Sequence, residues 1–148
     1  MTIIAYKDGI LAADDAFVQE DMMWGTAEKI WKRNDGTLIG AHGEAGWCEK
    51  FKDWALGGEE GDGPEAEKEG PGYSCGLIVR QDGSVEIHAP TGVLPFSGEY
   101  YAMGSGSALA LGAMASGKTA AEAVGIAIQH CCWCGGGTTV LTHEADNG

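Results

Sequence analysis

Thr2-Ile-Ile-Ala-Tyr-Lys7, Asp8-Gly9 and Ile10-Leu-Ala-Ala13 follow one another at the start of the chain and decide the fold. Two strand-like runs separated by Asp-Gly are a strong signal for a β-hairpin. The same dipeptide stands between strand-like runs twice more, so the sequence predicts three antiparallel hairpins. Their strands are expected at 2–7, 10–13, 29–33, 37–41, 75–80 and 84–88, and segments 16–23 and 93–103 are candidates for two further strands.

Three helices and a final strand are expected around these hairpins. Residues 45–56 carry apolar side chains close to an i, i+3, i+4, i+7 pattern and stop at Gly57-Gly58. Residues 107–116 stop at Gly117, and 119–130 begin with Thr119-Ala-Ala-Glu122, the pattern of a capping box. Residues 138–142 favour a closing strand. Two antiparallel sheets with helices outside them would bury these apolar stripes, so we expect an α+β fold.

Length and composition favour one globular, water-soluble domain over residues 1–148. The chain has 148 residues, of which 44% are hydrophobic, and a net charge of −13 from 9 basic and 22 acidic residues. Such a charge repels phosphate, so we expect no nucleic-acid partner and no membrane partner. We expect no signal peptide, because the first residues lack a basic and an apolar region, and the five cysteines fit free thiols in a reducing compartment, so a cytoplasmic location is expected.

The stretch 57–72 combines glycine, proline and six acidic residues with a single lysine. We interpret it as a solvated, mobile acidic loop within the domain. The less favoured alternative is a binding site for a basic partner.

Chemically notable residues gather at the start of the chain. Removal of Met1 would leave Thr2 with a hydroxyl nucleophile and a free amine on the same residue. A two-residue turn at Asp8-Gly9 brings Asp14 and Asp15 to this end of the hairpin, and the pairing alone does not choose between them. Lys29, if it points inward, would favour the neutral form of the Thr2 amine while an aspartate holds it in place.

Two glycine-rich junctions between strand and helix add to this group. Gly40-Ala-His-Gly43 offers backbone N–H groups that could bind an oxyanion, or it is a plain turn. In Gly104-Ser105-Gly106, Ser105 could hydrogen-bond the amine of Thr2, and Ser107 could serve as a helix N-cap.

These residues, with Ala27-Glu-Lys29-Ile and Gly135-Gly-Gly-Thr138, occur in the order found in proteasome β-type subunits, and the chain most closely resembles the bacterial peptidase HslV. The resemblance covers nearly the whole chain. It implies the four-layer αββα sandwich of N-terminal-nucleophile hydrolases, in which two antiparallel sheets are flanked by helices. It also implies stacked homo-oligomeric rings that act as a threonine endopeptidase on unfolded peptides, with a ring-ATPase unfoldase as partner.

The resemblance also implies a role for individual residues. Thr2 would be the nucleophile, Asp14, Lys29 and Ser105 its catalytic partners, and the N–H of Gly43 the oxyanion hole. The substrate pocket would be formed by Ala27, Trp31, Ala41 and Ala45. Cys131 and Cys134 stand where the family often has an acid and a hydroxyl residue. No cofactor is expected beyond a structural sodium ion, held by backbone carbonyls near these two cysteines.

Two other functions compete with the peptidase. One is a catalytically silent, ring-forming scaffold on the same fold. The other is a nucleotide-binding module, because Gly112-Ala-Met-Ala-Ser-Gly-Lys-Thr119 matches the P-loop pattern. A zinc site is disfavoured, since the sequence has only one Cys-x-x-Cys, at Cys131 to Cys134, without a second ligand pair.

Overall fold

The computed structural model describes residues 2–66 and 74–144. The chain divides into two compact units, Met1–Ile30 with Gly98–Thr142, and Trp31–Ser97 with His143–Gly148. Helices and antiparallel sheets occur in the described residues, so the predicted α+β class is confirmed. The single domain predicted for residues 1–148 stays a prediction.

The first unit is built on a four-stranded antiparallel sheet with the order β10-β1-β2-β11. Its strands are β1 (Ile3–Lys7), β2 (Ile10–Asp14), β10 (Tyr100–Gly104) and β11 (Thr138–Thr142). Lys7 pairs with Ile10, and Ala5 pairs with Ala12, as predicted. Asp8 and Gly9 have φ angles of 52° and 77°, the positive pair that a type I′ turn requires. The predicted first hairpin and the closing strand are therefore confirmed.

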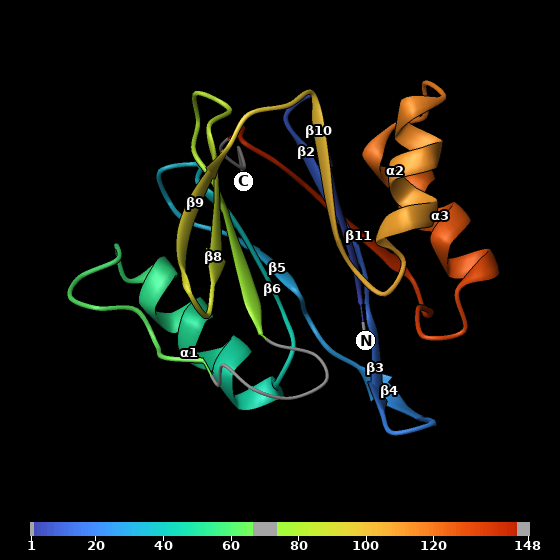
Figure 1. Ribbon diagram of the computed structural model, residues 1–148, viewed down its shortest axis with the longest axis horizontal. Helices are drawn as coiled ribbons and strands as arrows, with labels where there is room; N and C mark the ends of the chain where they lie inside the picture. The colour runs from blue at the N-terminus through green and yellow to red at the C-terminus, as the bar shows by residue number, and fades with distance from the viewer. Residues whose placement is uncertain (1, 67–73, 145–148) are drawn as a thin grey trace. The chain divides into compact units, whose positions relative to one another are not determined.

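Helices α2 (Ser107–Ala115) and α3 (Ala120–His130) lie side by side on one face of this sheet (Figure 1). Thr119 caps α3, and its hydroxyl and Glu122 form the predicted capping box. The cap of α2 is Gly106 rather than Ser107, which is the first helical residue. The core between helices and sheet consists mainly of small residues, which lets α3 approach the strands closely.

The candidate strand at 16–23 is in fact a hairpin. Strands β3 (Ala16–Gln19) and β4 (Met22–Thr26) form a separate two-stranded sheet. The turn between them contains Glu20, whose φ is 55°. The strand prediction was incomplete because this turn lacks the glycine that marks the other hairpins.

The second unit contains most of a five-stranded antiparallel sheet with the order β5-β6-β7-β8-β9. Its strands are β5 (Ile30–Lys32), β6 (Leu38–His42), β7 (Cys75–Val79), β8 (Val85–Ala89) and β9 (Gly92–Phe96). The second and third predicted hairpins are confirmed as neighbouring strand pairs. The candidate strand at 93–103 is wrong as one element, since β9 and β10 belong to different sheets.

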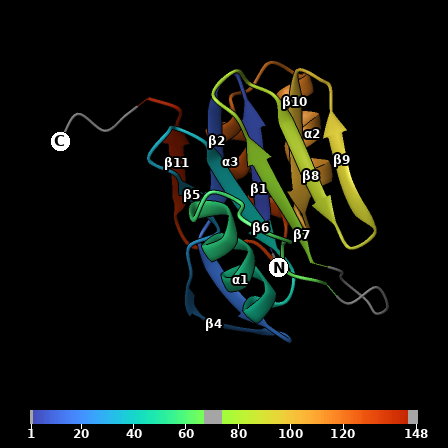
Figure 2. The same ribbon diagram turned by 90° about the vertical axis from the view of Figure 1, so that its left-hand side faces the viewer.

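Helix α1 (Ala45–Leu56) packs on this sheet and is seen in front of it in Figure 2. Glu44 caps the helix by accepting the N–H groups of Gly46 and Trp47 at 2.9 and 2.7 Å. The buried face repeats every four residues, with Trp47, Phe51 and Ala55. Phe51 packs directly over Gly76 of β7. A Cβ atom added at Gly76 would lie 2.3 Å from the Cζ atom of Phe51.

Residues 57–66 form no helix or strand, in agreement with the predicted loop, and residues 67–72 of that prediction lie outside the described residues. Within the described ranges, no helix has the length and apolar character needed to cross a membrane.

Candidate functional site

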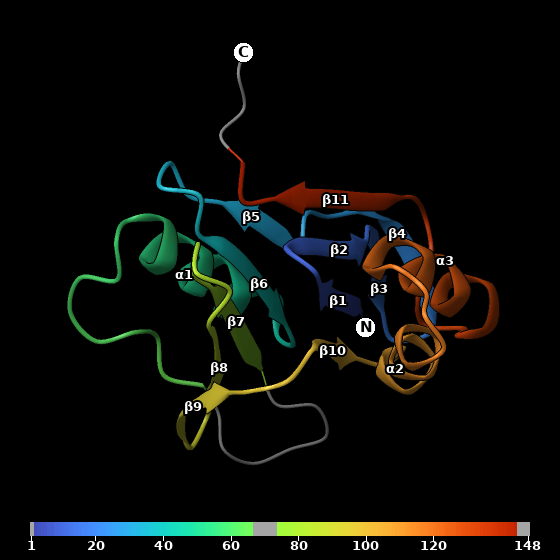
Figure 3. The ribbon, with the colours of Figure 1, turned by 90° about the horizontal axis from the view of Figure 1, so that it is seen from above.

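A buried aspartate organises the end of β2 in the first unit. Asp14 is 1% exposed and Lys29 is 8% exposed, and their side chains form an ion pair at 2.8 Å. The same oxygen of Asp14, Oδ1, accepts the N–H of Ile3 at 3.0 Å, and Oδ2 accepts the N–H of Gly135 at 3.0 Å. Asp14 therefore joins the residue after Thr2, the cation of Lys29 and the loop before β11. Figure 3 shows β1, β2 and β11 as neighbours of one sheet.

The neighbouring carboxylate has a different environment. Asp15 is only half-buried, and its Oδ1 accepts the N–H of Gly137 at 2.6 Å. The backbone around it continues the pairing, since its N–H donates to the Gly137 carbonyl and its carbonyl accepts from Ala27. Asp14 is thus the acid that contacts Lys29, whereas Asp15 fixes the glycine loop.

Thr2 precedes β1 and is buried, with 6% of its surface exposed. The turn after β10 lies against its backbone, because Gly106 donates its N–H to the Thr2 carbonyl at 3.4 Å. Gly104 has a φ of 98°, and a Cβ there would lie 2.1 Å from the same carbonyl oxygen. Glycine is therefore required at 104 both by the dihedral angle and by the close approach. Ser105, between these two glycines, is exposed.

Cys131 and Cys134 flank the turn that follows α3. The N–H of Cys134 donates to the Cys131 carbonyl at 3.2 Å, and the Cys134 side chain is buried. Burial, the adjoining Cys131 thiol and the negative charge of Asp14 raise the pKa of Cys134 to about 12. This thiol stays protonated at neutral pH. All five cysteines are free thiols, and among the described residues no cluster of three His, Cys, Asp or Glu could hold a metal ion.

The remaining predicted site residues are spread over both units. Ala27 belongs to the first unit, while Trp31, Ala41, Gly43 and Ala45 belong to the second. Ala41 lies in the core around Phe51, and Trp31 packs against that core, with the ammonium of Lys52 5.8 Å from the centre of its ring. Ala45 is exposed at the first position of α1.

Gly43 has a φ of 117°, and an added Cβ would lie 2.4 Å from the Cα of Ser74. The positive φ angle and the close approach of Ser74 each require glycine at position 43, independently of any role of its N–H as an oxyanion hole. The preceding residue, His42, is a further titratable group, and burial lowers its pKa to about 4.

The P-loop match does not have the structure that the motif needs. Residues 112–115 are the last residues of α2, and Thr119 is the cap of α3. The hydroxyl of Ser116 bonds back to the carbonyl of Gly112 at 2.9 Å. A phosphate-binding loop follows a strand, whereas this stretch connects two helices.

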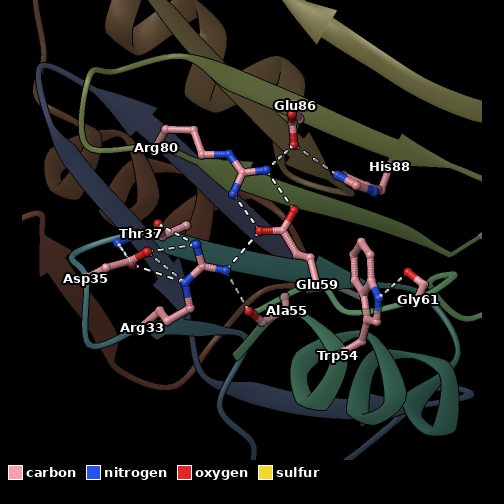
Figure 4. Close-up of polar contacts among 10 residues, drawn as sticks. All are labelled: Arg33, Asp35, Thr37, Trp54, Ala55, Glu59, Gly61, Arg80, Glu86 and His88. Carbon is pink, nitrogen blue, oxygen red and sulfur yellow. Dashed lines mark hydrogen bonds and ion pairs between the residues drawn. The ribbon is translucent and has the colours of Figure 1, made fainter. Parts of the chain in front are cut away.

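A second charged cluster was not predicted from the sequence. Glu59, in the acidic loop, accepts hydrogen bonds from Arg33 at 2.8 Å and from Arg80, and Arg80 also contacts Glu86 at 2.7 Å (Figure 4). The prediction of a wholly solvated loop is therefore wrong at Glu59. A signal was present in the sequence, since the arginines open two similar turns, Arg33-Asn-Asp-Gly-Thr37 and Arg80-Gln-Asp-Gly-Ser84.

Comparison with solved structures shows the fold. The chain is similar to the BPH of Thiobacillus denitrificans in complex with epoxomicin, with a TM-score of 0.70, 20% sequence identity and coverage of 98% of both chains. A second structure of the same BPH gives a TM-score of 0.68 and 20% identity over 99% of both chains. No protein-family model matches the chain, and no curated protein matches it significantly.

Proposed function

We propose that the protein is a threonine-type peptidase subunit whose nucleophile is Thr2, which becomes the N-terminal residue once Met1 has been removed. The observation that carries the proposal is the buried pair of Asp14 and Lys29, joined through one carboxylate oxygen to the backbone of Ile3. Burying two charges costs free energy, which only close contact and further hydrogen bonds offset. This pair has such contacts, and one of them is to the backbone of Ile3, the residue after Thr2.

The chemistry assigns each group a task. The Thr2 hydroxyl attacks the carbonyl carbon of a peptide bond while the α-amine accepts the hydroxyl proton. The tetrahedral intermediate collapses to an ester on Thr2, the leaving amine takes up a proton, and water then hydrolyses the ester. The positive charge of Lys29 favours the neutral, basic form of the Thr2 amine. Asp14 holds Lys29 in place, Ser105 supports the amine, and the N–H of Gly43 would stabilise the oxyanion.

The assembly belongs to the same proposal. The two large sheets and their helices would stack as a four-layer αββα sandwich, with Ala27, Trp31, Ala41 and Ala45 near the pocket for the residue before the cut. Subunits would form stacked homo-oligomeric rings in the cytoplasm. Access would be limited to unfolded chains supplied by a ring-ATPase, with no cofactor beyond a sodium ion near Cys131 and Cys134.

The test begins with the N-terminal residue, determined by intact mass spectrometry. On material that begins with Thr2, we expect cleavage of fluorogenic peptides that falls by roughly 10³-fold or more in Thr2→Ala. Thr2→Ser should retain activity, because it keeps the hydroxyl. Asp14→Asn should lose activity while Asp15→Asn keeps it. Peptidase activity that survives Thr2→Ala would exclude Thr2 as the nucleophile.

Epoxomicin, found in the solved structure of the BPH, is a useful second probe. We expect it to bind the processed protein and to protect it against thermal unfolding. The Thr2→Ala variant serves as the matched control and should show a smaller shift.

A catalytically silent scaffold is the second candidate. The observation in its favour is Cys134, a buried thiol with a raised pKa, in a place where the peptidases that the sequence resembles often carry an acid or a hydroxyl residue. Processed protein that forms rings and has no activity on a broad peptide panel would favour the scaffold.

A further inference from the structure

A cavity of about 450 Å³ lies in the second unit, between α1, the loop 61–66 and the connection from β8 to β9. Its volume falls in the lower part of the range of cavities that hold small ligands. None of the residues discussed for the peptidase lines it, so a ligand bound here would be independent of the proposed activity.

Four rings line this cavity, three from α1 (Trp47, Phe51 and Trp54) and one from β8 (His88). Phe51 stacks on Trp47 at 5.0 Å between ring centres and meets the edge of His88 at 5.3 Å. Trp54 lies 5.6 Å from His88. These contacts hold the rings in fixed orientations before any ligand arrives.

The loop 61–66, which also lines the cavity, is tied to the same tryptophans. The indole N–H of Trp47 donates to the Pro64 carbonyl, and that of Trp54 donates to the Gly61 carbonyl, each at 3.1 Å (Figure 4 shows the second). Because these N–H groups are already used, the half-buried Trp54 offers a ligand only its apolar ring surface, while Trp47 is buried. These two hydrogen bonds hold the loop in a fixed position beside α1, so the cavity is already formed before a ligand binds.

The charge around the cavity has one sign. Asp62 and Glu65 stand exposed on its rim, and neither forms an ion pair with a described residue. No lysine or arginine occurs among the described residues that line it. Glu59, three residues before Asp62, is by contrast already paired with Arg33 and Arg80.

We propose that this cavity binds an organic cation, a guanidinium or alkylammonium group carried on an apolar stem. The stem packs against the ring of Trp54 and the exposed side chain of Val93, and the charged group lies between the carboxylates of Asp62 and Glu65. A guanidinium suits the site best, because it is planar, stacks on aromatic rings and bonds carboxylates through two N–H groups. The protein's net charge of −13 adds a long-range attraction for such a ligand.

The probes are N-acetyl-arginine amide, its neutral isostere N-acetyl-citrulline amide, and agmatine, a free guanidinium compound without a peptide backbone. Binding is followed by ¹⁹F NMR of protein labelled with 5-fluorotryptophan. The chain has five tryptophans, and only Trp47 and Trp54 line the cavity. Their resonances should shift, while those of Trp24, Trp31 and Trp133 serve as internal controls.

We expect saturable binding of N-acetyl-arginine amide with a dissociation constant on the order of 1 mM, as the size of the ligand allows. The double variant Asp62→Asn/Glu65→Gln should weaken it by roughly tenfold or more. The matched control Glu60→Gln, in the same loop but outside the cavity, should leave it unchanged. Circular dichroism of each variant checks that the fold is kept.

Agmatine identifies the source of the cation. If agmatine shifts the same two resonances, a free cation suffices, and if only the amide does, the ligand is an arginine within a polypeptide. Both results support the cation site. Equal binding of the citrulline amide, or unchanged binding in the double variant, would overturn the proposal.

Discussion

Asp14→Asn is the most informative single substitution, because it removes one charge from the buried pair and keeps the shape of the side chain. The asparagine offers one acceptor oxygen where the carboxylate serves Lys29, Ile3 and Gly135 through two. Its amide group would face one of these donors, and the Lys29 ammonium would be left buried without its counterion. Breaking a buried pair in this way costs about 3–5 kcal/mol, a large part of the stability of an ordinary domain.

Urea denaturation measures this loss, with tryptophan fluorescence and circular dichroism as independent probes. A cost of that size lowers the unfolding midpoint by roughly 2 M at a typical m value. The control is Asp15→Asn, which alters one hydrogen bond at a half-buried carboxylate and should cost about 1 kcal/mol. All variants are compared at one protein concentration, since assembly would add to apparent stability.

The double variant Asp14→Asn/Lys29→Met then tests the pairing itself. With both charges gone, no ion is left buried, so the loss should be smaller than the sum of the two single losses. If Asp14→Asn costs no more than Asp15→Asn, or if the two single losses simply add, the assignment of a stabilising buried pair is refuted.

Other parts of the fold lead to three further predictions. Glu59→Gln should lower the free energy of unfolding by about 1–2 kcal/mol and speed proteolysis of residues 57–66. Arg80 and Arg33 lower the pKa of Glu59, so the stability that this carboxylate contributes is present at neutral pH. It should be lost as the pH falls below the ordinary pKa of a glutamate. Gly76→Ala should lower the free energy of unfolding by about 1–3 kcal/mol, because the added methyl group would collide with the ring of Phe51. Gly112→Ala has open space around it and should raise the free energy of unfolding by about 0.5–1 kcal/mol. Thermal unfolding measures both changes. Burial lowers the pKa of His42 from its ordinary 6.5 to about 4 in the folded protein, so the unfolded chain takes up the proton first as the pH falls. The free energy of unfolding should therefore be highest above pH 6.5 and decrease toward pH 4. The variant His42→Gln should reduce this pH dependence, measured by urea titrations at several pH values.

The elements that the sequence predicted well are those fixed by local rules. The turn at Asp8-Gly9 sets the register of β1 and β2, because only residues that tolerate positive φ fit a type I′ turn. Helix α1 spans residues 45–56 as predicted, since its apolar spacing and Gly57-Gly58 act within a few residues. Thr119 and Glu122 likewise bind each other's backbone within one turn.

The features that the local sequence pattern left open or missed depend on distant partners, although the family resemblance pointed to Asp14 and Lys29. Asp14 and Asp15 are adjacent and equally acidic, and what separates them is contact with Lys29 and Gly135, which lie 15 and 121 residues away. Glu59 was expected in water because its neighbours are acidic, yet the two arginines that bind it come from separate hairpin turns. Three of the four rings around the cavity show in the sequence only as apolar residues of a helix, and the fourth, His88, comes from a strand.

The position of Gly135 also has a consequence for the order of folding. Its bond to Asp14 closes a loop of 121 residues, and contacts over such separations form late and slowly. During synthesis, the first hairpin emerges long before the glycine that completes the environment of its aspartate. A chain interrupted before residue 135 would carry Asp14 with one donor missing. The environment of Asp14 can therefore be completed only after residue 135 has been synthesised.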